Sequence, residues 1–305
     1  MKYYISDNRD KSKPYREALN KYGYQETSVA EADFVLLDHN WKDGYRDATK
    51  IFRECRADGK KIFMFPHGFR CNMFWDAIYT TDDNIDAFFA PASGHIMVMK
   101  AGGYPAPMIS TGFPWCKVKK WEPVTPVKIL FAPIHPDWGE TYIYSQFALE
   151  WNKEAWAKIR LLKHKKEITV YHGLTPEVNG LTTEDEIIYH RSDLTIDAAV
   201  ALIDKHDLII AHDTFAALAI ARGKSVIMFN DHFYHAPNGM ISKYWGFYER
   251  AGFIYPHNII GCDDLDNLIL QAGRPDTRVA TWKTNFIGVS FDPYYFISKI
   301  KEFTE

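Results

Sequence analysis

The stretch DLIIAHDTFAALAIARGKSVIMF, residues 207–229, decides the fold class. Two short apolar runs, 207–211 and 225–229, enclose a segment of small apolar residues over 215–222. Continuous apolar runs of this length are typical of parallel strands buried on both faces, and a helix between them completes a βαβ unit. Ligands bind at the carboxyl ends of strands in parallel α/β sheets. The polar residues at the end of the first strand are His212, Asp213 and Thr214.

The same alternation of strand and helix continues along the rest of the chain. In the second part, the predicted strands are 127–132, 167–171 and 186–190, and the predicted helices are 144–163 and 193–205. In the first part, the predicted strands are 2–5, 33–38, 61–66, 85–90 and 107–111, and the predicted helices are 14–22, 44–58 and 93–102. Strands separated by helices indicate right-handed crossovers around a parallel sheet.

The segment PWCKVKKWEPVTP, residues 114–126, interrupts this rhythm with its prolines and lysines. A chain of 305 residues also exceeds the usual size of one domain. We therefore predict an α/β protein with two Rossmann-like, doubly wound parallel-sheet domains that face a cleft. The predicted parts are a first domain over 1–116, a linker over 117–126, a second domain over 127–290 and a helix over 291–305. That helix either packs locally or crosses back to the first domain.

Composition excludes several classes of protein. The net charge of -3 gives no global nucleic-acid or membrane footprint. The basic runs 117–120 and 158–166 leave a local nucleic-acid contact open, although such runs are mostly solvated faces. The four cysteines lack zinc-ligand spacing, so no metal site is expected. No signal sequence and no apolar run near the ~20 residues of a membrane span is visible, so we expect a cytoplasmic protein without stable membrane insertion.

Histidines are concentrated after the predicted strands. Six of the 12 histidines occupy such positions: His39, His67, His135, His172, His212 and His232. His67 follows the strand KIFMF and precedes Gly68, which permits a sharp turn. A neutral imidazole there is suited to accept a proton from an attacking hydroxyl. The alternative is a histidine that is only hydrogen-bonded in a turn.

Four other residues after strands are candidates for binding a donor. His135, near Trp138, is placed to meet a phosphate or a sugar. His172 and Gly173 are candidates for lining a nucleobase pocket. Arg191 offers a fixed charge for a diphosphate through bidentate hydrogen bonds, although an exposed salt bridge is an equal alternative.

The polar corner at 212–214 has two interpretations. Asp213 precedes the apolar helix and is a good candidate for its N-cap. The N-terminus of a helix also presents N–H groups and a partial positive charge, which favour a phosphate. Thr214 and the following backbone are therefore the predicted phosphate contacts, and His212 is placed to assist them.

Two segments resemble known sequence patterns. The segment DTFAALAIARGKSVIMF is similar to the heptosyltransferase-type pattern DTxxxHLAxxxGKPV, and more loosely to the corresponding segment of CDP-glycerol glycerophosphotransferases. The segments FPHGF and ISTGFPW also look like the latter group. With two doubly wound halves, a linker and a terminal helix, the chain resembles the GT-B architecture of nucleotide-sugar glycosyltransferases. The resemblance implies that His67 is the catalytic base and that Thr214 with its helix binds the donor phosphates.

The function implied by this resemblance is transfer of a sugar, or a related group, from a nucleotide-diphosphate donor to an acceptor hydroxyl. The GT-B resemblance implies no bound metal, and we expect no cofactor because the nucleotide-sugar is a substrate. The acceptor is left open among a glycan, a lipid-linked molecule and a nucleic acid. Alternatives are a phage-type enzyme that glycosylates modified DNA bases, a nucleotide-sugar epimerase, and a non-catalytic nucleotide-sugar binding protein. The last rests on the lack of an acidic residue over 215–222, where many GT-B enzymes hold the ribose.

Overall fold

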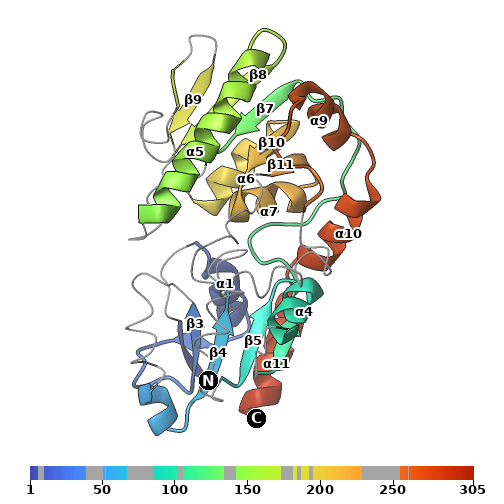
Figure 1. The fold of residues 1–305 in the computed structure, drawn as a ribbon. Coiled ribbons are helices and arrows are strands. Elements are labelled where there is room, and N and C mark those ends of the chain that lie inside the picture. Colours follow the sequence, from blue (N-terminus) through green and yellow to red (C-terminus); the bar gives the residue numbers. More distant parts are fainter. Residues whose placement is uncertain are drawn as a thin grey trace. The chain divides into compact units, whose positions relative to one another are not determined.

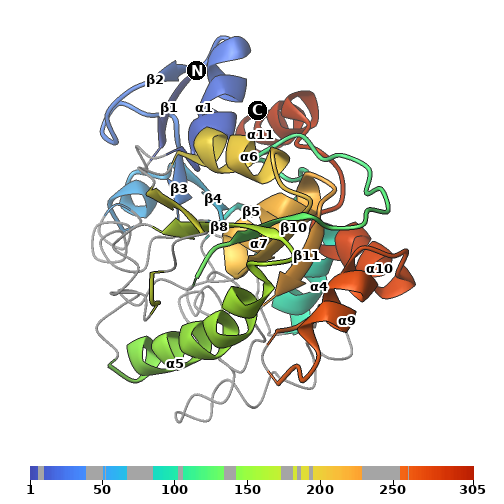
Figure 2. The same ribbon diagram turned by 90° about the horizontal axis from the view of Figure 1, so that it is seen from above.

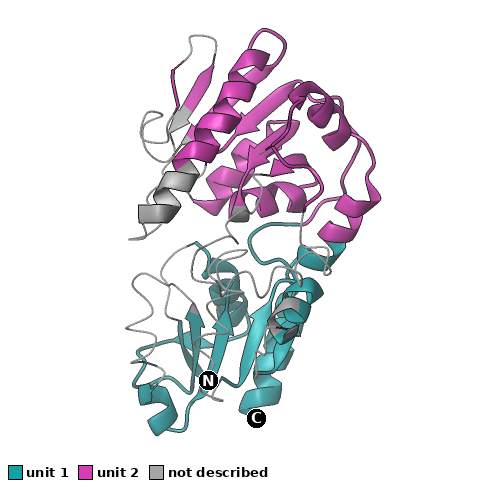
Figure 3. Ribbon diagram, in the orientation of Figure 1, with its two compact units in different colours: residues 1–117, 284–305 teal, residues 118–283 magenta. Residues whose placement is uncertain are grey.

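The computed structural model divides into two compact units (Figure 3). Unit 1 contains residues 1–117 and 284–305, and unit 2 contains residues 118–283. Residues 118–126, assigned to the linker from the sequence, thus belong to unit 2, and residues 284–290, assigned to the second domain, belong to unit 1. The structure describes residues 1–5, 10–38, 51, 53–66, 85–101, 106–133, 142–172, 181–183, 187–191, 195–228, 255–259 and 261–305.

Unit 1 is built on a six-stranded parallel sheet with the order β2-β1-β3-β4-β5-β6 (Figure 1). Its strands are β1 (Lys2–Ile5), β2 (Gln25–Glu26), β3 (Phe34–Asp38), β4 (Lys61–Phe65), β5 (Ala87–Ala90) and β6 (Met108–Ser110). The central strands β3, β4 and β5 are short, largely apolar runs with side chains buried on both faces, whereas the edge strand β2 is polar and exposed. This burial is the reason that the runs are continuous rather than alternating.

The core of unit 1 joins one face of this sheet to two helices that are far apart in sequence. Helix α1 (Lys13–Lys21) and helix α11 (Pro293–Thr304) both contribute buried side chains to the cluster that contains Phe63 and Phe89. The rings of Phe89 and Phe296 lie 4.8 Å apart, centroid to centroid. The last helix of the chain is therefore part of the core of unit 1. A further helix, α4 (Ser93–Ala101), follows β5.

A glycine is required where β6 ends. Gly112 has φ +91, and a Cβ added there would lie 2.4 Å from the carbonyl oxygen of Ser290. The chain on either side is held by hydrogen bonds, since the N–H of Phe113 donates to Val289 and the N–H of Asp292 donates to Thr111. The glycine of the ISTGFPW segment thus permits close packing against the chain that leads into α11.

Unit 2 is built on a five-stranded parallel sheet with the order β11-β10-β7-β8-β9. Its strands are β7 (Lys128–Phe131), β8 (Glu167–His172), β9 (Ile188–Arg191), β10 (Leu208–Ala211) and β11 (Ser225–Met228). The two parallel sheets confirm the predicted α/β fold class. They also confirm that the described part of the opening stretch forms two adjacent parallel strands, Leu208–Ala211 and Ser225–Met228, joined by a helix.

Helices cover both faces of the sheet in unit 2 (Figures 1 and 2). One face packs against α5 (Tyr142–Ile159), which is followed by a 3-10 turn over Arg160–Leu162, and against α9 (Leu265–Ala272). The other face packs against α6 (Ile196–Asp204) and α7 (Asp213–Ala221). Alternate side chains of β8 show this division, because Ile168 and Val170 belong to the cluster with α5 whereas Thr169 bonds to His206, next to α6.

Residues 118–126 are held firmly against the rest of unit 2. The N–H of Lys119 donates to the carbonyl of Ala221 at 2.7 Å, and the N–H of Val124 donates to that of Gly273 at 3.1 Å. Cβ atoms added at Gly223 and Gly273 would lie 2.3 and 2.2 Å from the carbonyl oxygens of Lys120 and Val124. The proline-rich segment is therefore packed backbone to backbone on two turns of unit 2.

The remaining elements show where the sequence-based assignment was incomplete. It missed β2, α9 and α10 (Thr277–Phe286). Helix α9 begins at an N-cap, Asp264, whose side chain accepts from the N–H of Asn267. This signal was present in the sequence as DDLDNL but was not used. Most of the helix predicted over 44–58 lies outside the described residues, although residues 53–57 are helical.

Candidate functional site

The candidate site is the carboxyl edge of the sheet in unit 2, where β10 ends and α7 begins. His212 is the N-cap of α7, with extended backbone angles of φ -126 and ψ 155. Its carbonyl accepts from the N–H of Ala216 at 3.3 Å, which is the first bond of the helix. The His212 side chain makes no capping hydrogen bond. The imidazole of His212 therefore does not bond to the N–H groups of the first turn.

The prediction that Asp213 is the N-cap is wrong. Asp213 is the first residue of α7, and His212 precedes it in the cap position. The first turn of the helix includes Asp213 and Thr214, so the helix begins two residues before the predicted start at residue 215. The structure describes the backbone of Asp213 but not its side chain.

Exposure along α7 changes sharply after its first turn. Residues 216–221 are at most 3% exposed, as expected for a helix of small apolar residues that packs directly on β10 and β11. His212, Thr214 and Phe215, in contrast, are partly exposed. These three residues therefore keep partial exposure beside the helix N-terminus, although Nδ1 of His212 is itself buried. Phe215 was not among the predicted site residues.

The structure describes the other predicted site residues only in part. His172 ends β8 and Arg191 ends β9, so these neighbouring residues share the carboxyl edge and pair in the sheet register. The side chains of both residues lie outside the described part of the structure. His67, His135 and Gly173 lie outside the described residues altogether. Their predicted roles remain predictions.

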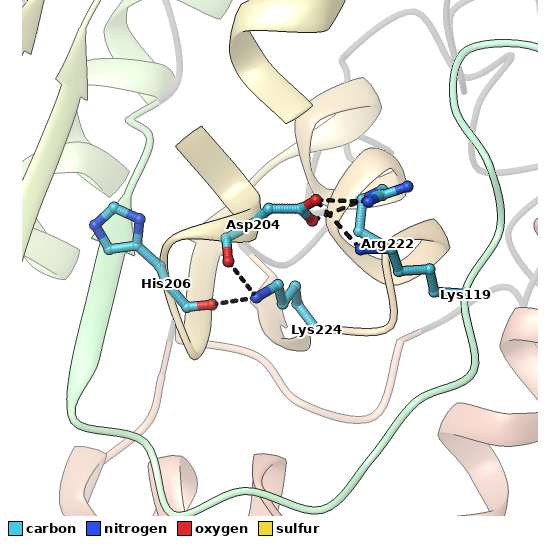
Figure 4. Close-up of polar contacts among 5 residues, drawn as sticks. All are labelled: Lys119, Asp204, His206, Arg222 and Lys224. Carbon is cyan, nitrogen blue, oxygen red and sulfur yellow. Dashed lines mark hydrogen bonds and ion pairs between the residues drawn. The ribbon is translucent and has the colours of Figure 1, made fainter. Parts of the chain in front are cut away.

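A cluster of charged side chains that the sequence did not suggest lies at the opposite, amino edge of the sheet (Figure 4). Arg222 donates from Nε and Nη2 to the two carboxylate oxygens of Asp204, at 3.0 and 2.5 Å. Lys119 Nζ lies 3.3 Å from the same carboxylate. The Arg222 hydrogen bond is the main reason that the pKa of Asp204 is lowered.

The same cluster satisfies the end of helix α6. Lys224 Nζ donates to the carbonyl of Asp204 at 2.9 Å and to the carbonyl of His206 at 2.7 Å (Figure 4). Neither carbonyl has a partner within the helix. Burial lowers the pKa of Lys224, and the nearby Asp204 and Asp207 oppose that shift. These contacts join the α6–β10 turn, the α7–β11 turn and residue 119. The role of the cluster is structural.

Two buried histidines also escaped the sequence analysis. His206 is 4% exposed, with Nδ1 2.8 Å from the carbonyl of Leu202 and Nε2 2.9 Å from the hydroxyl of Thr169. His257 is 2% exposed, beside the end of β11, and its Nε2 lies 3.7 Å from Asp276. Burial lowers the pKa of both imidazoles. Both are therefore neutral near pH 7.

The basic run over 158–166 is largely paired within unit 2. Lys158 contacts Glu154 at 2.7 Å and the carbonyl of Ile259 at 3.1 Å. Lys165 contacts Asp266 at 2.9 Å, and Lys166 donates to the carbonyl of Pro126 at 2.5 Å. These contacts favour the interpretation that the run is a solvated face of unit 2 rather than a nucleic-acid contact.

Among the residues that the structure describes, no group of three or more histidine, cysteine, aspartate and glutamate side chains is arranged to hold a metal ion. None of the described helices combines the length and apolar character needed to cross a membrane.

Two α/β units with parallel sheets, together with the return of the chain end to unit 1, are the architecture of the GT-B fold. Solved structures with this similarity include a protein assigned as a UDP-N-acetylglucosamine 2-epimerase from Listeria monocytogenes. It has 14% sequence identity and a TM-score of 0.57, over 99% of this chain and 95% of that chain. Another is the glycosyltransferase SnogD from Streptomyces nogalater, with 11% identity and a TM-score of 0.50, over 100% and 99% of the two chains.

Neither a protein-family model nor the sequence of a curated protein matches the chain. At the low identities to the solved structures, the similarity establishes the fold rather than the reaction. The prediction of a GT-B fold is confirmed, and the activity has to be argued from the site.

Proposed function

We propose that the protein is a glycosyltransferase that moves a sugar, or a related group, from a nucleotide-diphosphate donor to an acceptor hydroxyl without a bound metal. The observation that carries the proposal is the partly exposed first turn of α7 at the carboxyl edge of a parallel sheet. Such a turn presents N–H groups and a partial positive charge to an anion. The GT-B fold agrees with this assignment, because one similar structure is a glycosyltransferase.

In the proposed arrangement, unit 2 binds the donor. The N–H groups of the first turn of α7 and the hydroxyl of Thr214 bind the diphosphate, and His212 assists them. His172 and Gly173 line the nucleobase pocket, and His135 and Arg191 contact the diphosphate. The backbone at the start of α7 and the partial exposure of Thr214 and His212 support this arrangement.

The proposed reaction begins with an acceptor held by unit 1. His67 accepts the proton of the acceptor hydroxyl, and the hydroxyl oxygen forms a bond to the anomeric carbon of the donor sugar. The bond between that carbon and the diphosphate oxygen breaks, and its electron pair remains on the diphosphate. The helix dipole, Thr214 and the cationic side chains stabilise this charge, so that no metal is needed. The acceptor is a glycan, a lipid-linked molecule or a nucleic acid.

The test measures nucleotide binding and turnover separately. Thr214→Val is expected to weaken nucleoside diphosphate binding by about 10- to 100-fold, the effect of one hydrogen bond to a charged group. Thr277→Val is the control, because Thr277 is an exposed threonine in the first turn of another helix, α10. His67→Ala is expected to leave binding unchanged and to reduce turnover by about 10²- to 10⁴-fold. Turnover within a few-fold of wild type would contradict the role of His67.

A second candidate is a nucleotide-sugar epimerase, favoured by the similarity to the Listeria monocytogenes protein. The two candidates differ in their need for an acceptor. A glycosyltransferase consumes the nucleotide-sugar efficiently only when an acceptor is present and releases the nucleoside diphosphate in step with the glycosylated product. An epimerase converts the sugar without an acceptor. The non-catalytic alternative predicts nucleotide-sugar binding without turnover for any acceptor, and a DNA-modifying enzyme predicts salt-dependent duplex binding.

A further inference from the structure

Two aromatic side chains meet above the carboxyl end of β7. Tyr171 is the penultimate residue of β8, and Phe215 belongs to the first turn of α7, which follows β10. Their ring centroids are 5.1 Å apart, with an angle of 36° between the ring planes. Since β7 lies between β10 and β8 in the sheet, the pair spans the end of this central strand.

The two rings differ in exposure. Tyr171 is 5% exposed and lies on the sheet face that packs against α6 and α7, opposite Ile168 and Val170. Phe215 is partly exposed, although every residue of α7 after it is buried. Tyr171 therefore contacts the Phe215 ring from inside the protein, while Phe215 as a residue keeps partial exposure beside the helix N-terminus. The exposed turn thus offers two different kinds of contact, polar groups for an anion and a flat apolar surface.

We propose that Phe215 is the surface on which the nucleobase of the donor stacks, and that Tyr171 positions its ring. This inference rests on the proposed donor site and extends it to a residue that recognises the base. A nucleoside diphosphate joins an anion to a flat ring, which matches the pairing of Thr214 with Phe215 in the same turn. Stacking on an aromatic ring tolerates any base because each base has a π-face. Phe215 therefore supplies affinity for the base without selecting its identity.

The test compares a ligand that has a base with one that lacks it. Binding is measured for the tightest ligand among UDP, GDP, ADP and CDP, and for inorganic pyrophosphate, in the full-length protein. Phe215→Leu is expected to weaken nucleotide binding by about 5- to 150-fold, the range for loss of one base–aromatic stack. Pyrophosphate binding is expected to stay within twofold. Phe215→Tyr retains the ring and is expected to bind both ligands as the wild type does.

Several outcomes distinguish this inference from the proposed donor site. The stacking role is overturned if Phe215→Leu binds the nucleotide within twofold of wild type. It is also overturned if the variant loses equal affinity for nucleotide and pyrophosphate, because the ring then acts only through helix packing. Thr214→Val is expected to weaken both ligands, and this result supports the donor site whether or not Phe215 stacks on the base. If wild type binds neither ligand, the donor site and the inference both fail.

Tyr171 supplies an independent pair of variants. Tyr171→Phe keeps the supporting ring and is expected to leave the ratio of nucleotide to pyrophosphate affinity unchanged. Tyr171→Leu removes the support and is expected to lower this ratio toward the value found for Phe215→Leu. A ratio unchanged in Tyr171→Leu contradicts the positioning role of Tyr171.

Discussion

Replacing Gly223 by alanine is expected to destabilise unit 2 and to detach the segment over 118–120. Two costs act together at this position. Gly223 has φ +75, a conformation that costs an L-residue about 1–2 kcal/mol. An added Cβ would also lie 2.3 Å from the carbonyl oxygen of Lys120, so that one of the two backbone segments must move. Such a movement breaks the 2.7 Å hydrogen bond from Lys119 to Ala221.

The magnitude follows from these contributions. Overpacking costs about 1–3 kcal/mol and loss of the hydrogen bond about 0.5–1.5 kcal/mol. Alanine recovers about 0.4–1 kcal/mol by restricting the unfolded chain. With the conformational cost included, we expect Gly223→Ala to lower the free energy of unfolding by about 1.5–6 kcal/mol.

Two other glycines of unit 2 separate the two costs. Gly261 has φ +72, and an added Cβ would meet no atom within 4 Å, so Gly261→Ala tests the conformational cost alone. Gly273 has φ -84, and its added Cβ would lie 2.2 Å from the carbonyl oxygen of Val124, so Gly273→Ala tests the steric cost alone. We expect Gly223→Ala to be the most destabilising of the three.

The assay combines guanidinium unfolding with hydrogen exchange measured by mass spectrometry. In Gly223→Ala, the amide of Lys119 should exchange faster than in wild type because its acceptor is lost, whereas Gly261→Ala should leave that exchange unchanged. If Gly223→Ala is no more destabilising than Gly261→Ala, and Lys119 keeps its protection, the packing of residues 118–120 against the α7–β11 turn is refuted.

Two further predictions concern groups in and beside the amino-edge cluster. Because burial lowers the pKa of His206 below that of the unfolded chain, the unfolded state binds more protons and stability falls as the pH drops below about 6.5. The free energy of unfolding changes by at most about 1.4 kcal/mol per pH unit for this one group. His206→Gln should reduce that slope when unfolding is measured from pH 7.5 to 5.5. An unchanged slope would mean that other groups cause the pH dependence. Asp204→Asn should lower the free energy of unfolding by about 1.5–3 kcal/mol because it weakens the bonds to Arg222. Glu302→Gln alters an exposed ion pair and should lower it by less than about 1 kcal/mol. Equal losses of stability in chemical unfolding would contradict this difference.

Local sequence signals predicted the strands and the fold class well. The apolar runs DLIIA and SVIMF form adjacent parallel strands because their side chains are buried on both faces, and this requirement is visible in each run by itself. The helix between them was predicted, but its first residue was placed two positions late. The cap was misassigned because an aspartate before an apolar helix has the higher general preference, whereas the chain here turns at His212.

Local sequence signals do not predict contacts between residues that are far apart in the chain. The proline-rich segment was read as a linker because proline and lysine interrupt periodicity. Its packing on Gly223 and Gly273 joins residues about 100 and 150 positions apart, and no local pattern records it. The basic run over 158–166 predicts a solvated face and leaves a nucleic-acid contact open, but it does not predict that Lys158 and Lys165 pair with Glu154 and Asp266.

The sequence by itself determined the α/β class, the two successive sheets and the position of a polar corner after β10, because periodicity and the strand-end rule are local properties. Only the tertiary structure decided that α7 is buried except at its first turn and that Phe215 lies against Tyr171. The physical reason is that exposure and ring contacts depend on which strands become neighbours. The order β10-β7-β8 brings residues 171 and 215 together across a strand that ends at residue 131.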